Sequence, residues 1–269
     1  MTTEQVVPPS GLDVLVQGTG PALLLAHGAG GGIQGNFGLV LDDLARDHTL
    51  IGPHYPGAGR TPVASEPLDL DDLADRLVAA AVALGHERFA VLGESLGTTV
   101  AVRAATRHPD RVTALVLTAG FPVADPVLAL AAELIQILAK AGEWNAVARL
   151  ACLSCMTDAQ LSEISDAELD ALVTATRTTM PPGTPDHFHL VSRVDVRDDL
   201  PRISVPALVV TPTGDRLVLP DSHRALATGI PGATLIELPG AAHILSEPDR
   251  ATWLRHVHEF LAGVESHSA

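Results

Sequence analysis

Lysine is almost missing from this chain: Lys140 is the only one among 269 residues, and arginine supplies the remaining positive charge. Lysine and arginine together number 17, against 32 aspartates and glutamates, which gives a formal net charge of −15. A surface of this charge repels phosphate backbones. We therefore expect no nucleic-acid partner.

Cysteine is equally scarce, with only Cys152 and Cys155 present. A Cys-x-x-Cys pair can be redox-active or can supply half of a metal site. However, no second cysteine pair exists, and the segment does not lie where a predicted strand meets a helix. We expect two small buried residues on one helix face and no metal. This cysteine usage favours a reduced, cytoplasmic protein.

No apolar segment is long enough to cross a bilayer. The longest helix-like apolar stretch, residues 127–139, is interrupted by Glu133 and Gln136. Residues 1–10 lack a basic segment followed by an apolar one, so we expect no secretory signal. Hydrophobic residues nevertheless make up 46% of the chain, enough for a sizeable core. We expect a soluble protein without a membrane partner. The sequence does not decide between a monomer and a homodimer.

Short apolar runs typical of strands alternate with helical patterns along most of the chain. The predicted strands span residues 12–16, 22–26, 49–52, 89–92, 112–117, 207–211 and 233–238. Turn residues 18–21 favour a hairpin-like connection between the first two. Helical spacing appears at residues 39–44, 70–84, 98–106 and 248–262. This alternation predicts an α/β fold with a mostly parallel sheet covered by helices on both faces.

One block interrupts the alternation. Residues 121–196 contain only helical patterns and loops, and they are far longer than a usual crossover between strands. We expect a helical cap, or lid, inserted above the carboxyl edge of the sheet, where ligands of open α/β sheets bind. The predicted core domain comprises residues 1–120 and 197–269.

The motif Gly93-Glu94-Ser95-Leu96-Gly97 lies between the predicted strand 89–92 and the predicted helix 98–106. A strand that turns sharply into a helix presses the neighbours of the central residue against the backbone, and glycine avoids that clash. The turn exposes a hydroxyl near helix amides that can receive an anion. The motif therefore predicts Ser95 as a nucleophile.

A serine nucleophile needs a base within hydrogen-bond reach, and histidine is the usual one. Among 12 histidines, His243 follows the last predicted strand directly, in Gly240-Ala241-Ala242-His243. A loop of small residues at the carboxyl edge can bring this imidazole over Ser95. His27, the main rival, precedes Gly28 at the end of a strand, where we expect it to bind the backbone.

The base in turn needs a carboxylate that holds its tautomer. Asp215 follows the predicted strand 207–211 at the same sheet edge, and the order Ser, Asp, His occurs in one known triad arrangement. Asp221 and Asp125 are alternatives, although we expect Asp221 to cap a helix.

The developing oxyanion needs preorganised donors, and the backbone N–H of Leu96 is one candidate. The other is expected from the glycine-rich loop after strand 22–26, with Ala29 as first choice and Gly30 as second. We also place Gly30, Glu94, Phe121 and Trp144 in a substrate pocket. His187 and His189 in the inserted block are expected to form a solvated polar patch.

These motifs together resemble the α/β-hydrolase superfamily over nearly the whole chain. The matching pieces are His27-Gly28 after a strand, Pro56-Gly57-Ala58-Gly59-Arg60, the motif 93–97, Thr213-Gly214-Asp215 and residues 240–243. The resemblance implies an eight-stranded core, a helical cap, a Ser95-Asp215-His243 triad and no cofactor. His54 departs from the family pattern, which commonly has aspartate there, and the loop after His27 is unusually rich in glycine.

The expected activity is that of a serine hydrolase cleaving an ester, lactone or thioester of a small to medium, largely apolar substrate through an acyl-enzyme. Three alternatives stay open. A carbon–carbon bond hydrolase and a cofactor-free perhydrolase use the same residues. A ligand-binding or biosynthetic protein can also use this fold without hydrolysis.

Overall fold

A single eight-stranded sheet forms the centre of the protein, which we describe from a computed structural model covering residues 4–6 and 11–268. The resemblance implied eight strands, and their order in the sheet is β1-β2-β4-β3-β5-β6-β7-β8. β2 runs antiparallel to both of its neighbours, β1 and β4, and the other neighbouring strands are parallel to one another. The strands are β1 Glu4–Val6, β2 Val14–Gln17, β3 Ala22–Ala26, β4 Thr49–Pro53, β5 Phe89–Glu94, β6 Val112–Thr118, β7 Ala207–Pro212 and β8 Thr234–Leu238.

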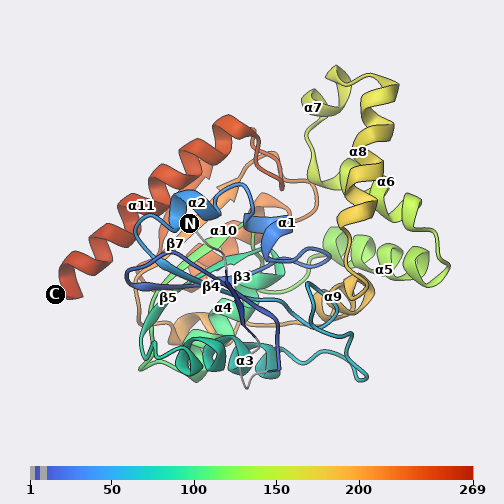
Figure 1. The fold of residues 1–269 in the computed structure, drawn as a ribbon. Coiled ribbons are helices and arrows are strands. Elements are labelled where there is room, and N and C mark those ends of the chain that lie inside the picture. The colour runs from blue at the N-terminus through green and yellow to red at the C-terminus, as the bar shows by residue number, and fades with distance from the viewer. Residues whose placement is uncertain (1–3, 7–10, 269) are drawn as a thin grey trace.

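Helices cover both faces of the sheet (Figure 1). In β3 the side chains alternate: Leu24 joins the core beneath α3, α4 and α10, whereas Leu23 and Leu25 join the core beneath α1, α2 and α11. The helices are α1 Ile33–Phe37, α2 Leu41–Leu44, α3 Leu70–Ala83, α4 Leu96–Arg107, α5 Pro126–Lys140, α6 Trp144–Cys155, α7 Asp158–Glu163, α8 Asp166–Thr179, α9 Thr184–Val191, α10 Pro220–Gly229 and α11 Glu247–Ser268, with a 3-10 turn at Leu200–Arg202.

The expected hairpin between the first two core strands is wrong. β2 pairs with β4, and β4 lies between β2 and β3 in the sheet. The turn residues 18–21 do reverse the chain, but they carry it past the position of β4. Gly18 and Gly20 lie against the backbone around Asp47 and His48, which leads into β4. The path of the chain between β2 and β3 is therefore determined by its contacts with the segment that leads into β4.

The sheet has a switch point between β3 and β5. After β3 the chain adds β4 on one side, and it then crosses to add β5 on the other side. Crossovers that leave in opposite directions open a crevice at the carboxyl ends of the two strands, and ligands of α/β sheets bind there. The loop after β3 and residue Ser95 after β5 both lie at this crevice.

Between β6 and β7, where every residue is described, the chain forms the helices α5 to α9 and no strand. The stretch leaves and returns at one place, because Val123 and Asp195 form an isolated antiparallel bridge. Figure 1 shows α6, α7 and α8 standing beyond one end of the sheet. The insertion thus lies on the side of the sheet where the switch point opens.

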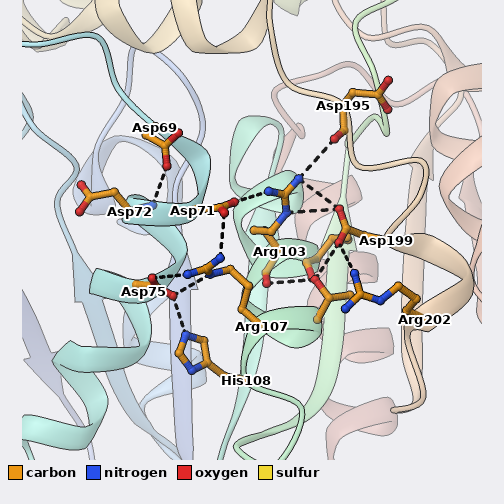
Figure 2. Close-up of polar contacts among 12 residues, drawn as sticks. Asp69, Asp71, Asp72, Asp75, Arg103, Arg107, His108, Asp195, Asp199 and Arg202 are labelled. Carbon is orange, nitrogen blue, oxygen red and sulfur yellow. Dashed lines mark hydrogen bonds and ion pairs between the residues drawn. The ribbon is translucent and has the colours of Figure 1, made fainter.

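An ion-pair network fastens the returning end of the insertion to the core (Figure 2). Arg103 of α4 pairs with Asp71 of α3 and with Asp199, and it donates to the carbonyl of Asp195. Arg107 adds a bidentate pair with Asp75. The network therefore ties α3, α4 and the segment before β7 together beneath the sheet.

Among the described residues, no helix has the length and hydropathy needed to cross a membrane.

Candidate active site

Ser95 lies at a strained turn between β5 and α4. Its backbone has φ 54° and ψ −120°, a conformation that a side chain with a Cβ rarely adopts, and Ser95 forms the N-cap of α4. A Cβ on Gly97 would lie 1.8 Å from the carbonyl oxygen of Ala26, and one on Gly93 would lie 2.4 Å from the carbonyl oxygen of Gly97. Both glycines of the motif are therefore required by the close approach of β3, β5 and α4.

Replacement of Gly97 by alanine should lower the free energy of unfolding by about 3 kcal/mol, because the new methyl group meets fixed backbone atoms. Gly263→Ala is the matched control. This glycine also lies in a helix, α11, and a Cβ there meets nothing within 4 Å. Alanine should leave stability unchanged there or raise it by up to about 1 kcal/mol. Urea unfolding of both variants measures the difference, and equal stabilities would contradict the close packing described here.

His243 and Asp215 form a buried pair at the carboxyl ends of the neighbouring strands β8 and β7. His243 Nδ1 lies 2.6 Å from Asp215 Oδ2. The other oxygen, Oδ1, accepts hydrogen bonds from the backbone amides of Leu217 and Val218, each at 2.9 Å. The backbone thus fixes one oxygen of the carboxylate, and the other oxygen binds the imidazole.

A second histidine approaches the same carboxylate. His223 of α10 is fully buried, and its Nε2 lies 3.4 Å from Asp215 Oδ2. Burial opposes ionisation of Asp215, but attraction to His243, the hydrogen bond from His243 and the close approach of His223 outweigh it and lower the pKa of Asp215 to about 2. Burial likewise opposes the charged form of His243, yet attraction to Asp215 raises the pKa of His243 above its usual value. The pair is therefore built to stabilise an imidazolium beside a carboxylate.

Ser95 and His243 line one cavity. Both residues are largely buried, with exposed fractions of 8% and 7%. No hydrogen bond between these two side chains is present among the described residues, and the Nε2 side of the imidazole is the one not engaged by Asp215. Such bonds are often long in the absence of substrate.

The loop after β3 lies beside Ser95. A Cβ on Gly28 would be 3.2 Å from the Cβ of Ser95. Within the described part of the chain, the backbone amides of Ala29 and Leu96 have no acceptor, whereas the amide of Gly30 donates to His187 Nδ1 at 3.3 Å. Ala29 and Gly30 were the two candidates for an oxyanion donor in this loop. The amide of Ala29 is therefore the one that is free to donate a hydrogen bond.

His187 corrects the expectation of a solvated patch. Its side chain is fully buried and joins α9 to two loops of the core. Nε2 donates to the carbonyl of Pro56 at 2.9 Å, and Nδ1 accepts from Gly30. Burial lowers the pKa of His187 to about 4, which keeps the ring neutral and able to accept. His27 likewise binds the backbone, at Gly28 and Tyr55, as expected.

The cavity has a volume of about 300 Å³ and lies between the core and the insertion. Its walls are mainly apolar on the side of the inserted helices. The apolar residues that line it there are Ile135, Val147, Leu150, Ala151, Cys155, Met180 and Phe188, and the hydroxyl residues are Ser154, Thr176, Thr179 and Thr184. Cys155 and its neighbour Cys152 are buried and unpaired on α6, as the sequence indicated. The core side contributes Ser95, His243 and the glycines of the loop after β3.

The structure separates the four predicted pocket residues into two groups. Gly30 and Glu94 line the cavity, whereas Phe121 and Trp144 are absent from its lining. Phe121 is fully buried in the main core, and Trp144 packs against that core at the start of α6. Their ring positions are set by core packing, which the sequence does not reveal.

The alternative carboxylates have other partners. Asp125 caps α5 by accepting hydrogen bonds from Val127 and Leu128. Asp221 lies in the first turn of α10 rather than at its cap and pairs with Arg224. Asp215 is the carboxylate that meets His243.

Sheet order, the strained serine turn and the histidine–aspartate pair give the protein the architecture of an α/β hydrolase. The profile of the alpha/beta hydrolase fold family matches residues 21–156, half of the chain. The chain belongs to this family and is an enzyme of the hydrolase class, which confirms the resemblance drawn from its motifs.

Relatives in the family cleave several kinds of bond. The chain is 30% identical to pimeloyl-[acyl-carrier protein] methyl ester esterase of Chromobacterium violaceum, over 93% of this chain and 95% of the relative. It is 28% identical to pyrrolizixenacetamide deacetylase of Xenorhabdus hominickii, over 83% and 84%. The crystal structure of the enol-lactonase from Burkholderia xenovorans superposes with a TM-score of 0.82 at 22% identity, covering 96% of this chain and all (100%) of that one.

Proposed function

We propose that this hydrolase is a serine esterase that cleaves small to medium, largely apolar esters, lactones or thioesters through an acyl-enzyme. The observation that carries the proposal is the His243–Asp215 pair in the same cavity as Ser95. A carboxylate on Nδ1 fixes the tautomer whose Nε2 can accept a proton, and it stabilises the imidazolium that results.

The reaction proceeds in two halves. Ser95 Oγ attacks the substrate carbonyl while its proton passes to His243 Nε2, and the negative oxygen is held by the amides of Ala29 and Leu96. The tetrahedral intermediate collapses, and His243 protonates the leaving group. Water then attacks the acyl carbon while its proton passes to His243. The second tetrahedral intermediate collapses, the bond to Ser95 Oγ breaks, and His243 returns the proton to Ser95 as the acid leaves. The unused amides beside the strained turn support this assignment of the oxyanion site.

The cavity supports a substrate of limited size. Its volume of about 300 Å³ and its apolar wall of inserted helices fit an acyl or alkyl chain of a few carbons. The inserted segment, residues 121–196, acts in this proposal as the lid that shapes the acyl pocket. The esterase, deacetylase and lactonase relatives all act on carbonyl groups, and this supports the same choice of bond class.

Labelling with a fluorophosphonate tests the proposal. The intact protein should gain the mass of one phosphonyl group, on the peptide that contains Ser95, and should release a burst of nitrophenol from p-nitrophenyl butanoate. Ser154→Ala serves as the control because Ser154 lines the same cavity without a partner role in the chemistry, and it should label fully. Absence of both labelling and burst in the folded parent would reject a serine esterase.

A further inference from the structure

Glu94 is a carboxylate on the cavity wall that the proposed chemistry does not use. It precedes Ser95 directly, and its side chain is half-buried. Oε2 accepts a hydrogen bond from Asn36 Nδ2 at 3.2 Å. Oε1 has no hydrogen-bond partner in the part of the chain that the structure describes, and Glu94 forms no ion pair with any described basic side chain.

The charges around Glu94 do not neutralise it. His243 and Asp215 act on the carboxylate with opposite signs, and Asn36 of α1 is neutral. Cys155 and Arg250 line the same cavity from α6 and α11. Burial raises the pKa of the Cys155 thiol, and Arg250 donates to the carbonyl of Leu245 and makes no ion pair with Glu94 among the described residues. Burial accordingly raises the pKa of Glu94 itself. A carboxylate held partly out of water without a paired cation is costly, so the site favours a positive partner.

The rest of the cavity explains why such a partner must come from the substrate. The walls formed by the inserted helices are mainly apolar, with hydroxyl groups but no charged side chain among their lining residues, and the chain's only lysine, Lys140, does not line the cavity. Asn36 holds one carboxylate oxygen, the other has no hydrogen-bond partner among the described residues, and Glu94 and Ser95 line the same cavity. A largely apolar pocket with a carboxylate held in place on its wall selects ligands that carry a complementary group at that position.

We propose that Glu94 and Asn36 form a subsite for an ammonium group carried by the substrate close to the carbonyl that Ser95 attacks. The inference rests on the proposed esterase function and narrows its substrates to amino-substituted acyl groups. Because a charge-assisted hydrogen bond is at stake, loss of the carboxylate should reduce the preference for such substrates by about ten- to a hundredfold.

The test compares two esters of matched shape, p-nitrophenyl 3-aminopropanoate and p-nitrophenyl butanoate. The measured quantity is the ratio of their kcat/KM values in the wild type, in Glu94→Gln and in the control Glu143→Gln, an exposed carboxylate outside the cavity. The ratio should fall by about ten- to a hundredfold in Glu94→Gln only. Any change in His243 acts on both esters alike and cancels in the ratio. An equal ratio in wild type and Glu94→Gln overturns the subsite.

Two further arms separate charge from other causes. In the wild type the ratio should rise with pH as Glu94 loses its proton, whereas it should stay flat in Glu94→Gln while the substrate amine remains charged. For a third ester, p-nitrophenyl 3-hydroxypropanoate, kcat/KM should fall little in Glu94→Gln. If its kcat/KM falls as much as that of the amino ester, the site binds any hydrogen-bond donor, and the assignment to ammonium is wrong.

A binding measurement keeps the subsite independent of turnover. If neither ester is hydrolysed, the esterase function fails, and calorimetric titration with 3-aminopropanamide and butanamide examines Glu94 alone. The amino compound should bind the wild type at least about tenfold more tightly than butanamide does, and this advantage should vanish in Glu94→Gln. Equal binding of the two amides by the wild type overturns the proposal.

Discussion

Ser95→Ala is expected to lower kcat for p-nitrophenyl butanoate by on the order of a millionfold, because it removes the oxygen atom that forms the acyl-enzyme in the proposed reaction. Some acceleration over water should survive, since the amides of Ala29 and Leu96 and the cavity walls remain. The fluorophosphonate adduct should disappear completely. Stopped assays at high enzyme concentration, with labelling followed by intact mass, measure both effects.

The control for this variant is a measurement of its stability. Alanine has a Cβ as serine does, so the positive φ at residue 95 strains both side chains alike, and Ser95→Ala should unfold at nearly the same urea concentration as the parent. Activity within tenfold of the parent, in a folded Ser95→Ala protein, would mean that Ser95 is not the nucleophile.

Asp215→Asn is expected to lower kcat by about ten-thousandfold through a change of tautomer. Oδ1 of Asp215 accepts two backbone amides, so the carboxamide oxygen of asparagine should occupy that place. Its NH2 group then faces His243 Nδ1 and must donate to it. The remaining proton of the neutral ring moves to Nε2, where the ring can no longer accept a proton from Ser95.

The same variant should shift the pH profile in a defined direction. Asp215 raises the pKa of His243, so its replacement lowers that pKa and moves the acid limb of kcat/KM to lower pH. Asp221→Asn is the matched control, because this aspartate is exposed and pairs with Arg224. If Asp215→Asn leaves both the maximum of kcat/KM and the pH of its acid limb unchanged, another carboxylate fixes the tautomer of His243.

The features that the sequence predicted well are local or follow from strand order. The turn at Ser95 could be predicted because Gly93 and Gly97 lie within two residues of it, and their need for space is a property of one strand–turn–helix unit. The pairing of Asp215 with His243 follows from two consecutive parallel strands, β7 and β8, which are neighbours and end at one edge. Both inferences need only short-range geometry.

The features that escaped prediction depend on contacts between distant segments. β2 pairs with β4, which is about thirty residues further along, and no turn signal reports that choice. In the sequence, His187 has the features of a solvent-exposed polar residue of a helix. Its hydrogen-bond partners, Pro56 and Gly30, lie far away in the chain, and nothing near His187 in the sequence indicates them. The burial of Phe121 likewise results from packing around it. A single sequence carries no direct signal for such long-range contacts.

The bridge between Val123 and Asp195 makes the helical insertion a closed excursion from the sheet. Its two ends meet at one point, so residues can be gained or lost in between with only a small, logarithmic change in closure entropy and without displacing β6 or β7. Under the proposed function, substrate range and bond-breaking chemistry can therefore diverge separately in this scaffold. The wall of the cavity is free to vary while the reacting groups stay in register.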